Sequence, residues 1–234
     1  MKNDYMSVMI RFKEERIQYD LTQQQLCGHI KMTQSAFSRA EAGLRRFSFP
    51  ETKKLCPVVN IYYVFTGMKA KDAWRSMNPA ASTAEEILCH LYLIHIITNA
   101  SWIINRFEAI SGISVRHSFV RIQEHLEYLH YFPEGFKSGQ NIFHNVRHYC
   151  GLTQKRMAAM LGMDIKKLRK LEKGRLLPDS EVVWRMYDCF RVSPAFILKD
   201  VNALRNELDY ILGLLDENDR KAILQILEIW TKLL

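Results

Sequence analysis

The sequence contains few of the residues that interrupt helices. Its 234 residues include only 10 glycines and 6 prolines, whereas leucine, isoleucine, lysine, glutamate, arginine and glutamine, which favour helices, recur along the chain. The five cysteines are scattered, odd in number and without a CxxC pair. That pattern is typical of a reducing, cytosolic compartment, where cysteines act as small hydrophobes. The composition therefore predicts an all-α cytoplasmic protein.

No long hydrophobic run is free of polar residues. The most apolar stretch, 87–107, contains side chains that are costly in lipid, namely His90, His95, Asn99, Ser101, Asn105 and Arg106. It predicts a buried helix or a pair of helices. The first twenty residues are charged and lack an apolar core segment, so we expect no signal peptide and no membrane partner.

Motifs that carry common enzyme chemistry are missing too. The sequence has no GxxxxGK phosphate loop, no GxSxG and no HExxH. His144 and His148 lie four residues apart, but no nearby carboxylate or cysteine completes a metal-ligand set, which favours surface histidines. We expect no enzymatic activity, no cofactor and no metal.

Positive charge is in excess, and it is unevenly distributed. The net charge is +8 and the sequence pI is about 9.2, which suggests nucleic acid or a membrane face as a partner, or simply a basic protein. Residues 1–80 have 13 basic and 7 acidic side chains, and residues 139–200 have 12 and 6, so each region is +6. Residues 81–138 and 201–234 are each −2. This partition favours two nucleic-acid modules with neutral or acidic connectors.

Those two basic regions contain one pattern twice. LTQQQLCGHIKMTQSAFSRAEAG begins at Leu21, and LTQKRMAAMLGMDIKKLRKLEKG begins at Leu152, an offset of 131. At this offset apolar residues align with apolar residues over about fifty positions without a gap. The sequence therefore predicts a duplicated domain.

Each copy has the signals of two short helices joined by a turn. Thr22 and Thr153 are suited to cap the first helix with their hydroxyls. A break of a few residues follows, and then a second helix ends at Gly43 or Gly174. This arrangement is a helix-turn-helix. Pro57 should kink or shorten any helix that spans 50–59 of the first copy.

These motifs resemble the lambda-repressor/Cro-type (XRE-like) helix-turn-helix family. The shared features are Leu-Thr-Gln, a small residue four positions on, then methionine, then Glu-x-Gly, and the match covers 12–66 and 143–198. The resemblance implies five helices per copy and an arginine–glutamate pair that fixes helix orientation. By position these pairs are Arg16 with Glu41 and Arg147 with Glu172.

The resemblance also implies that the second helix of the first copy, 33–41, enters the DNA major groove. Glutamine can bind adenine, and arginine guanine, through two hydrogen bonds each. A glutamine that opens the preceding helix bonds a phosphate in the family and braces the glutamine at the start of the recognition helix, as Gln23 could brace Gln34. The predicted DNA-binding residues of this copy are Gln23, Thr33, Gln34, Ser35, Ser38 and Arg39.

The corresponding helix of the second copy, 164–172, is rich in cations and poor in amides. Asp164 would face DNA and repel phosphates unless it accepts a hydrogen bond from a cytosine. This copy is therefore expected to hold the DNA backbone more than to read sequence, or to have become a packing module. Its predicted DNA-binding residues are Gln154, Lys166, Lys167, Arg169 and Lys170.

The remaining segments are also expected to be helical. Helices over 83–131 would pack the two copies together or pair with another copy of the chain. The tail reads as two helices, with an apolar face on the second that would dimerise or fold back on its own repeat. The predicted domains are a first helix-turn-helix domain at 1–80, a connecting segment at 81–138, a second helix-turn-helix domain at 139–200 and a helical tail at 201–234, with homodimerisation through 201–234 or 84–131.

The sequence as a whole favours a bacterial or phage transcription regulator that binds specific double-stranded DNA. The alternative is an interaction module, like an antitoxin or an anti-regulator, in which one or both helix-turn-helix folds no longer bind DNA. Exposure of the two recognition helices would distinguish these functions.

Overall fold

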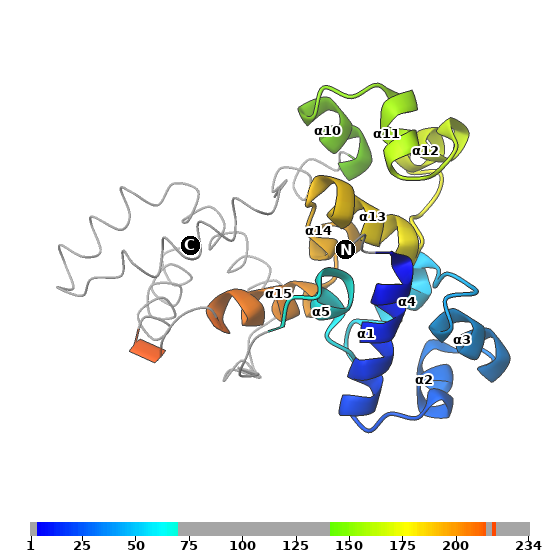
Figure 1. Cartoon of the computed structure of the whole chain (residues 1–234), viewed down its shortest axis with the longest axis vertical. Helices are drawn as coiled ribbons and strands as arrows, with labels where there is room; N and C mark the ends of the chain where they lie inside the picture. The colour runs from blue at the N-terminus through cyan, green and yellow to red at the C-terminus, as the bar shows by residue number, and fades with distance from the viewer. Residues whose placement is uncertain (1–3, 70–140, 214–216, 219–234) are drawn as a thin grey trace. The chain divides into compact units, whose positions relative to one another are not determined.

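The computed structural model describes residues 4–69, 141–213 and 217–218. The elements of these residues are α-helices, in agreement with the predicted fold class (Figure 1). In the first repeat they are α1 (Tyr5–Gln18), α2 (Gln23–Ile30), α3 (Gln34–Glu41), α4 (Phe49–Leu55) and α5 (Ile61–Thr66). In the second repeat they are α10 (Ile142–Tyr149), α11 (Gln154–Met160), α12 (Ile165–Glu172), α13 (Ser180–Phe190) and α14 (Pro194–Leu198).

Both repeats lie in one compact unit, formed by Met1–Met68 and His130–Ala203, and a second unit takes Lys69–Leu129 and Leu204–Leu234. The first helix predicted in the tail is present as α15 (Val201–Gly213). The connecting segment at 81–138, its apolar stretch at 87–107 and the second tail helix lie outside the described residues, as does the predicted dimer surface at 84–131. Within the described ranges, no helix combines the length and the apolar character that crossing a membrane requires.

Three phenylalanine rings form the centre of the first repeat. Phe12 of α1, Phe37 of α3 and Phe47, which precedes α4, are each at most 2% exposed. Their ring centroids lie 5.4–5.9 Å apart in tilted or edge-on pairs. Such pairs add to the free energy gained from burying apolar surface. This cluster fixes α3 to α1 and leaves the opposite face of α3 in solvent.

The backbone repeats at the same offset as the sequence. Gly43 and Gly174 both have φ near +70°. The turn after α2 has Lys31 at φ +59°, where the second repeat has Gly162 at φ +62°. Left-handed conformations recur only where a turn demands them, because they are unfavourable for residues other than glycine. The turns after the second and third helices therefore have the same backbone conformation in both repeats.

The fourth helix differs between the repeats, as Pro57 predicts. Helix α4 has 7 residues and ends at Leu55, whereas α13 has 11 and continues to Phe190. Asp188 stands in α13 at the position of Pro57. Proline has no N–H to donate and its ring crowds the preceding turn, so α4 stops short of it.

The fifth helix is also held differently in the two repeats. In the first, the Arg11 Nε donates to the Val64 carbonyl at 2.9 Å, and the Glu15 carboxylate accepts from the Asn60 N–H at 3.2 Å, which fastens α5 to α1. The residues at the positions of Arg11 and Glu15 are Ile142 and Val146, which have no polar group to make these bonds.

In the second repeat the last two helices also pack against the first repeat. Helix α13 contacts α1 and α5, and α14 contacts α5 as well (Figure 1). A cavity of about 520 Å³ lies between α4, α10 and α14. The two repeats are thus joined through helices rather than held apart by a linker.

Candidate nucleic-acid interface

Helix α3 presents the residues that the sequence predicts to read bases. Gln34, Ser35, Ser38 and Arg39 are exposed, while Phe37 and Ala40 on the opposite face are buried. Thr33 is exposed but is the N-cap, and its hydroxyl accepts from the Ala36 N–H at 3.3 Å. The structure thus brings the four helical residues together on one surface and assigns the Thr33 hydroxyl to helix capping.

Helix α12 presents a different chemistry at the same position. Lys166, Arg169 and Lys170 are exposed. Asp164, which the sequence suggested would oppose phosphates, is the N-cap, and its carboxylate accepts from the Lys167 N–H at 2.8 Å. The preference of aspartate for N-cap positions is the signal that would have found this role.

Lys167 forms an ion pair with another residue of the protein. Its Nζ lies 3.1 Å from the Asp179 carboxylate at the N-terminus of α13, and its side chain is only 35% exposed. A groove of about 700 Å³ between α12 and Leu176 is lined by Asp164, Lys166, Lys167 and Lys170. The cations of this groove other than Lys167 are the ones best placed to attract a phosphate.

A buried ion pair links the first and third helices of the first repeat. The Arg16 Nε donates to the Glu41 carboxylate at 2.7 Å, and Arg16 also donates to the Leu21 carbonyl. The Gln23 amide donates to the same carboxylate at 2.5 Å. Gln23 is therefore turned toward Glu41 rather than toward Gln34, because the carboxylate is the stronger acceptor.

The second repeat contains the same network with one addition. Arg147 donates to Glu172, and Gln154 donates to the second oxygen of that carboxylate at 2.6 Å. The Arg169 Nε then donates to the Gln154 carbonyl oxygen at 3.0 Å. Ser38, at the position of Arg169, is too short to reach in this way. Gln154 is thus fixed on both sides, and part of the Arg169 guanidinium is occupied.

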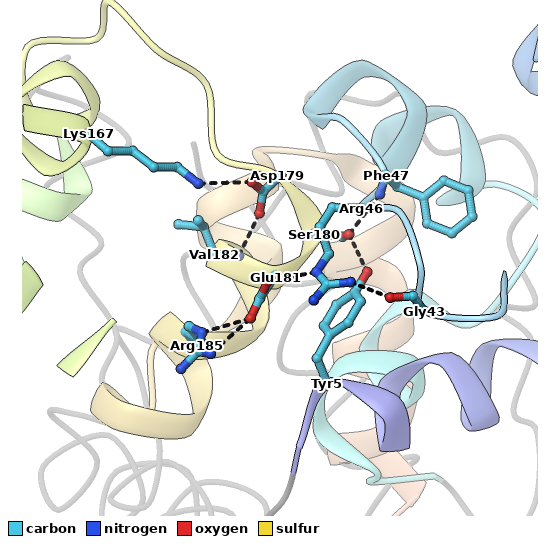
Figure 2. A network of polar contacts seen from close by, with 10 residues as sticks. All are labelled: Tyr5, Gly43, Arg46, Phe47, Lys167, Asp179, Ser180, Glu181, Val182 and Arg185. Atoms are coloured by element: carbon cyan, nitrogen blue, oxygen red, sulfur yellow. Dashed lines mark hydrogen bonds and ion pairs between the residues drawn. The ribbon is translucent and has the colours of Figure 1, made fainter. Parts of the chain in front are cut away.

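The two repeats meet through a polar contact that could not be predicted from the sequence. The Ser180 hydroxyl accepts from the Phe47 N–H at 3.1 Å and shares a hydrogen bond of 2.5 Å with the Tyr5 hydroxyl (Figure 2). The Phe47 carbonyl in turn accepts from the Ser180 N–H at 2.9 Å. All of the polar groups that this contact buries in Tyr5, Phe47 and Ser180 are paired with one another.

An ion pair lies beside this contact. The Arg46 Nε donates to the Glu181 carboxylate at 2.6 Å, and the guanidinium carbon is 4.2 Å from the centroid of the Tyr5 ring. Burial raises the pKa of Tyr5 to about 12, although the Ser180 hydrogen bond and Arg46 act in the opposite direction. Tyr5 is therefore a neutral phenol at ordinary pH. Figure 2 shows the ion pairs that join Glu181 to Arg46 and to Arg185.

Side chains that could bind a metal are not clustered among the residues that the structure describes. Within residues 4–69 and 141–213, no three His, Cys, Asp or Glu side chains gather as a metal site would require. His144 and His148 lie on the exposed side of α10 as a tilted pair, with their ring centroids 4.4 Å apart. Protein-family models, curated proteins and solved structures include no match to this chain.

Proposed function

We propose that the protein is a sequence-specific double-stranded DNA-binding transcription regulator with two lambda-repressor-like helix-turn-helix domains. The observation that carries the proposal is the exposure of Gln34, Ser35, Ser38 and Arg39 on one face of α3, at a helix-turn-helix position that the chain repeats 131 residues later. The net charge of +6 in each repeat-containing region supports an anionic partner.

In this proposal α3 reads the DNA sequence. Its amide and guanidinium groups have the donors and acceptors that distinguish base pairs in the major groove. The buried pair of Arg16 and Glu41 holds the helix that presents them, and Gln23 anchors α2 to the same carboxylate. Because these partners are fixed before DNA arrives, little ordering remains to oppose binding.

Helix α12 grips the backbone of an adjacent site. Its exposed groups are cations, which attract phosphate without distinguishing bases. Arg169 is partly engaged with Gln154, and Lys167 is paired with Asp179, so Lys166 and Lys170 supply the main phosphate contacts.

The test is the affinity of the full chain for duplex DNA as a function of salt, followed by selection from a random duplex library. We expect log affinity to fall steeply with log salt and one motif to be enriched. Weak binding with no enriched motif would refute the proposal and favour the interaction module.

A further inference from the structure

We infer that the junction between the two repeats lacks two-fold symmetry, and that the DNA site of one chain is therefore two unlike elements at fixed spacing rather than a palindrome. This inference rests on the proposed function. Palindromic sites mirror the two-fold symmetry of the proteins that bind them. A two-fold interface is self-complementary, because each contact is made twice with the two copies exchanged.

The contact built around Ser180 has no counterpart with the two repeats exchanged. It joins Tyr5, Arg46 and Phe47 of the first repeat to Ser180 and Glu181 of the second. With the offset of 131, the exchanged contact would join Phe136, Leu177 and Pro178 to Phe49 and Pro50. None of those five side chains has a hydroxyl or a charge, and Pro178 and Pro50 have no N–H. The exchanged residues could not make the side-chain hydrogen bonds or the ion pair of this contact.

Packing agrees with this chemistry. Helix α13 lies against α1 and α5. The exchanged arrangement would place α4 against α10 and α14. At that location the structure has instead the cavity of about 520 Å³, lined by Phe49 and Lys53 of α4, Phe143 of α10 and Ile197 of α14. The α13 side of the junction is packed, whereas the α4 side keeps this cavity and has one exposed hydrogen bond, from the Lys53 Nζ to the Lys199 carbonyl at 3.3 Å.

The different chemistries of α3 and α12 lead to the same expectation. An inverted repeat offers two identical half-sites, and each recognition helix would have to read the same bases. Gln34 of α3 is replaced by Ile165 in α12, and Arg39 by Lys170. The first repeat thus has an amide and a guanidinium that can each bind a base through two hydrogen bonds. At the equivalent positions the second repeat has an aliphatic side chain and an ammonium group, which acts as a point charge.

The experiment begins with the site selected from the random library and with the number of chains per duplex, measured from the mass of the complex. We expect one chain on a site of two unlike elements, bound about 100-fold more tightly than either element alone because the elements are linked. Replacing the weaker element with an inverted copy of the stronger one should then weaken binding at least tenfold. A palindrome held by one chain, or by two chains through one repeat each, would overturn the inference and leave DNA binding intact. Absence of any motif would overturn both.

The spacing tests the role of the junction itself. Inserting half a helical turn between the two elements should abolish the gain from linkage in the native chain. Arg46→Ala, which breaks the pair with Glu181, should reduce that spacing penalty several-fold. The matched control is Arg45→Ala, because Arg45 is as exposed as Arg46 (35% and 34% of the side chain) but pairs with Glu51 inside the first repeat. Equal effects of the two variants would show that the junction does not set the spacing.

Discussion

At the scale of single residues, both repeats contain the same arginine–glutamate ion pair at equivalent positions. Both pairs were expected from the resemblance, and in the structure each carboxylate also accepts from a glutamine. The position of that glutamine was evident from the sequence, but its partner was not, because an amide can serve either a neighbouring amide or a carboxylate. The choice depends on side-chain directions that only the packed helices define.

Arg16→Ala should destabilise the fold strongly. It leaves the Glu41 carboxylate, whose side chain is 6% exposed, with Gln23 as its remaining side-chain donor. Breaking such a buried pair lowers the free energy of unfolding by about 3 kcal/mol. Arg45→Ala breaks a more exposed pair and should lower it by less than about 1 kcal/mol. Urea denaturation of both variants measures the difference, and equal losses would contradict the expectation.

Lys31→Gly should stabilise the protein. Lys31 has φ +59°, a conformation that lysine adopts at a cost and glycine does not. We expect the free energy of unfolding to rise by about 0.5–1 kcal/mol. The reverse change in the second repeat, Gly162→Lys, should lower it, since a Cβ there would also lie 3.0 Å from the Arg185 guanidinium. Thermal denaturation of the two variants would refute this explanation if both shifted in the same direction.

At the scale of helices, local signals in the sequence were sufficient for much of the fold. Thr22 and Thr153 cap α2 and α11 as expected, and Pro57 marks the place that α4 does not pass. These features depend on a few neighbouring residues. The attachment of α13 to the first repeat was not predictable, because Tyr5 and Ser180 are 175 residues apart and neither stands out in a pattern.

If the proposed function holds, α3 and α12 should respond differently when one exposed cation of each is truncated. Arg39 and Lys170 occupy equivalent positions, so Arg39→Ala and Lys170→Ala are matched variants. Arg39→Ala should weaken binding to the selected site by about 1–3 kcal/mol and change binding to random DNA far less. Lys170→Ala should weaken both by a similar factor and reduce the salt slope by about 1. Affinity titrations over a range of salt test this, and equal losses on both DNAs for Arg39→Ala would show that Arg39 touches only phosphates.

At the scale of the whole unit, acid should loosen the junction between the repeats. Partial burial by itself would raise the pKa of Glu181, but hydrogen bonds from Arg46 and Arg185 outweigh it and lower that pKa below its ordinary value of 4.5. A carboxylate with a lowered pKa stabilises the folded state above the ordinary pKa. This stabilisation is lost as the pH falls through the folded-state pKa.

Glu181→Gln should therefore be less stable than the native chain at neutral pH, by about 1 kcal/mol or less. The difference should shrink as the pH drops below about 4.5, because the native chain loses the same interaction there. Urea midpoints measured between about pH 6 and about pH 3 would follow this convergence. Parallel curves for the two proteins would show that Glu181 contributes nothing specific in its charged form.

The hydrogen bonds between Phe47 and Ser180 also mean that the first repeat cannot complete its contacts until the second repeat has been synthesised. Phe47 is 2% exposed, and its N–H and carbonyl both pair with Ser180. Ser180 is synthesised 114 residues after the end of α5. At roughly 5–20 residues per second, the ribosome needs about 6–23 s to make that stretch. A nascent chain that has produced only its first repeat therefore lacks the partner of Phe47, and these hydrogen bonds form only after Ser180 has been synthesised.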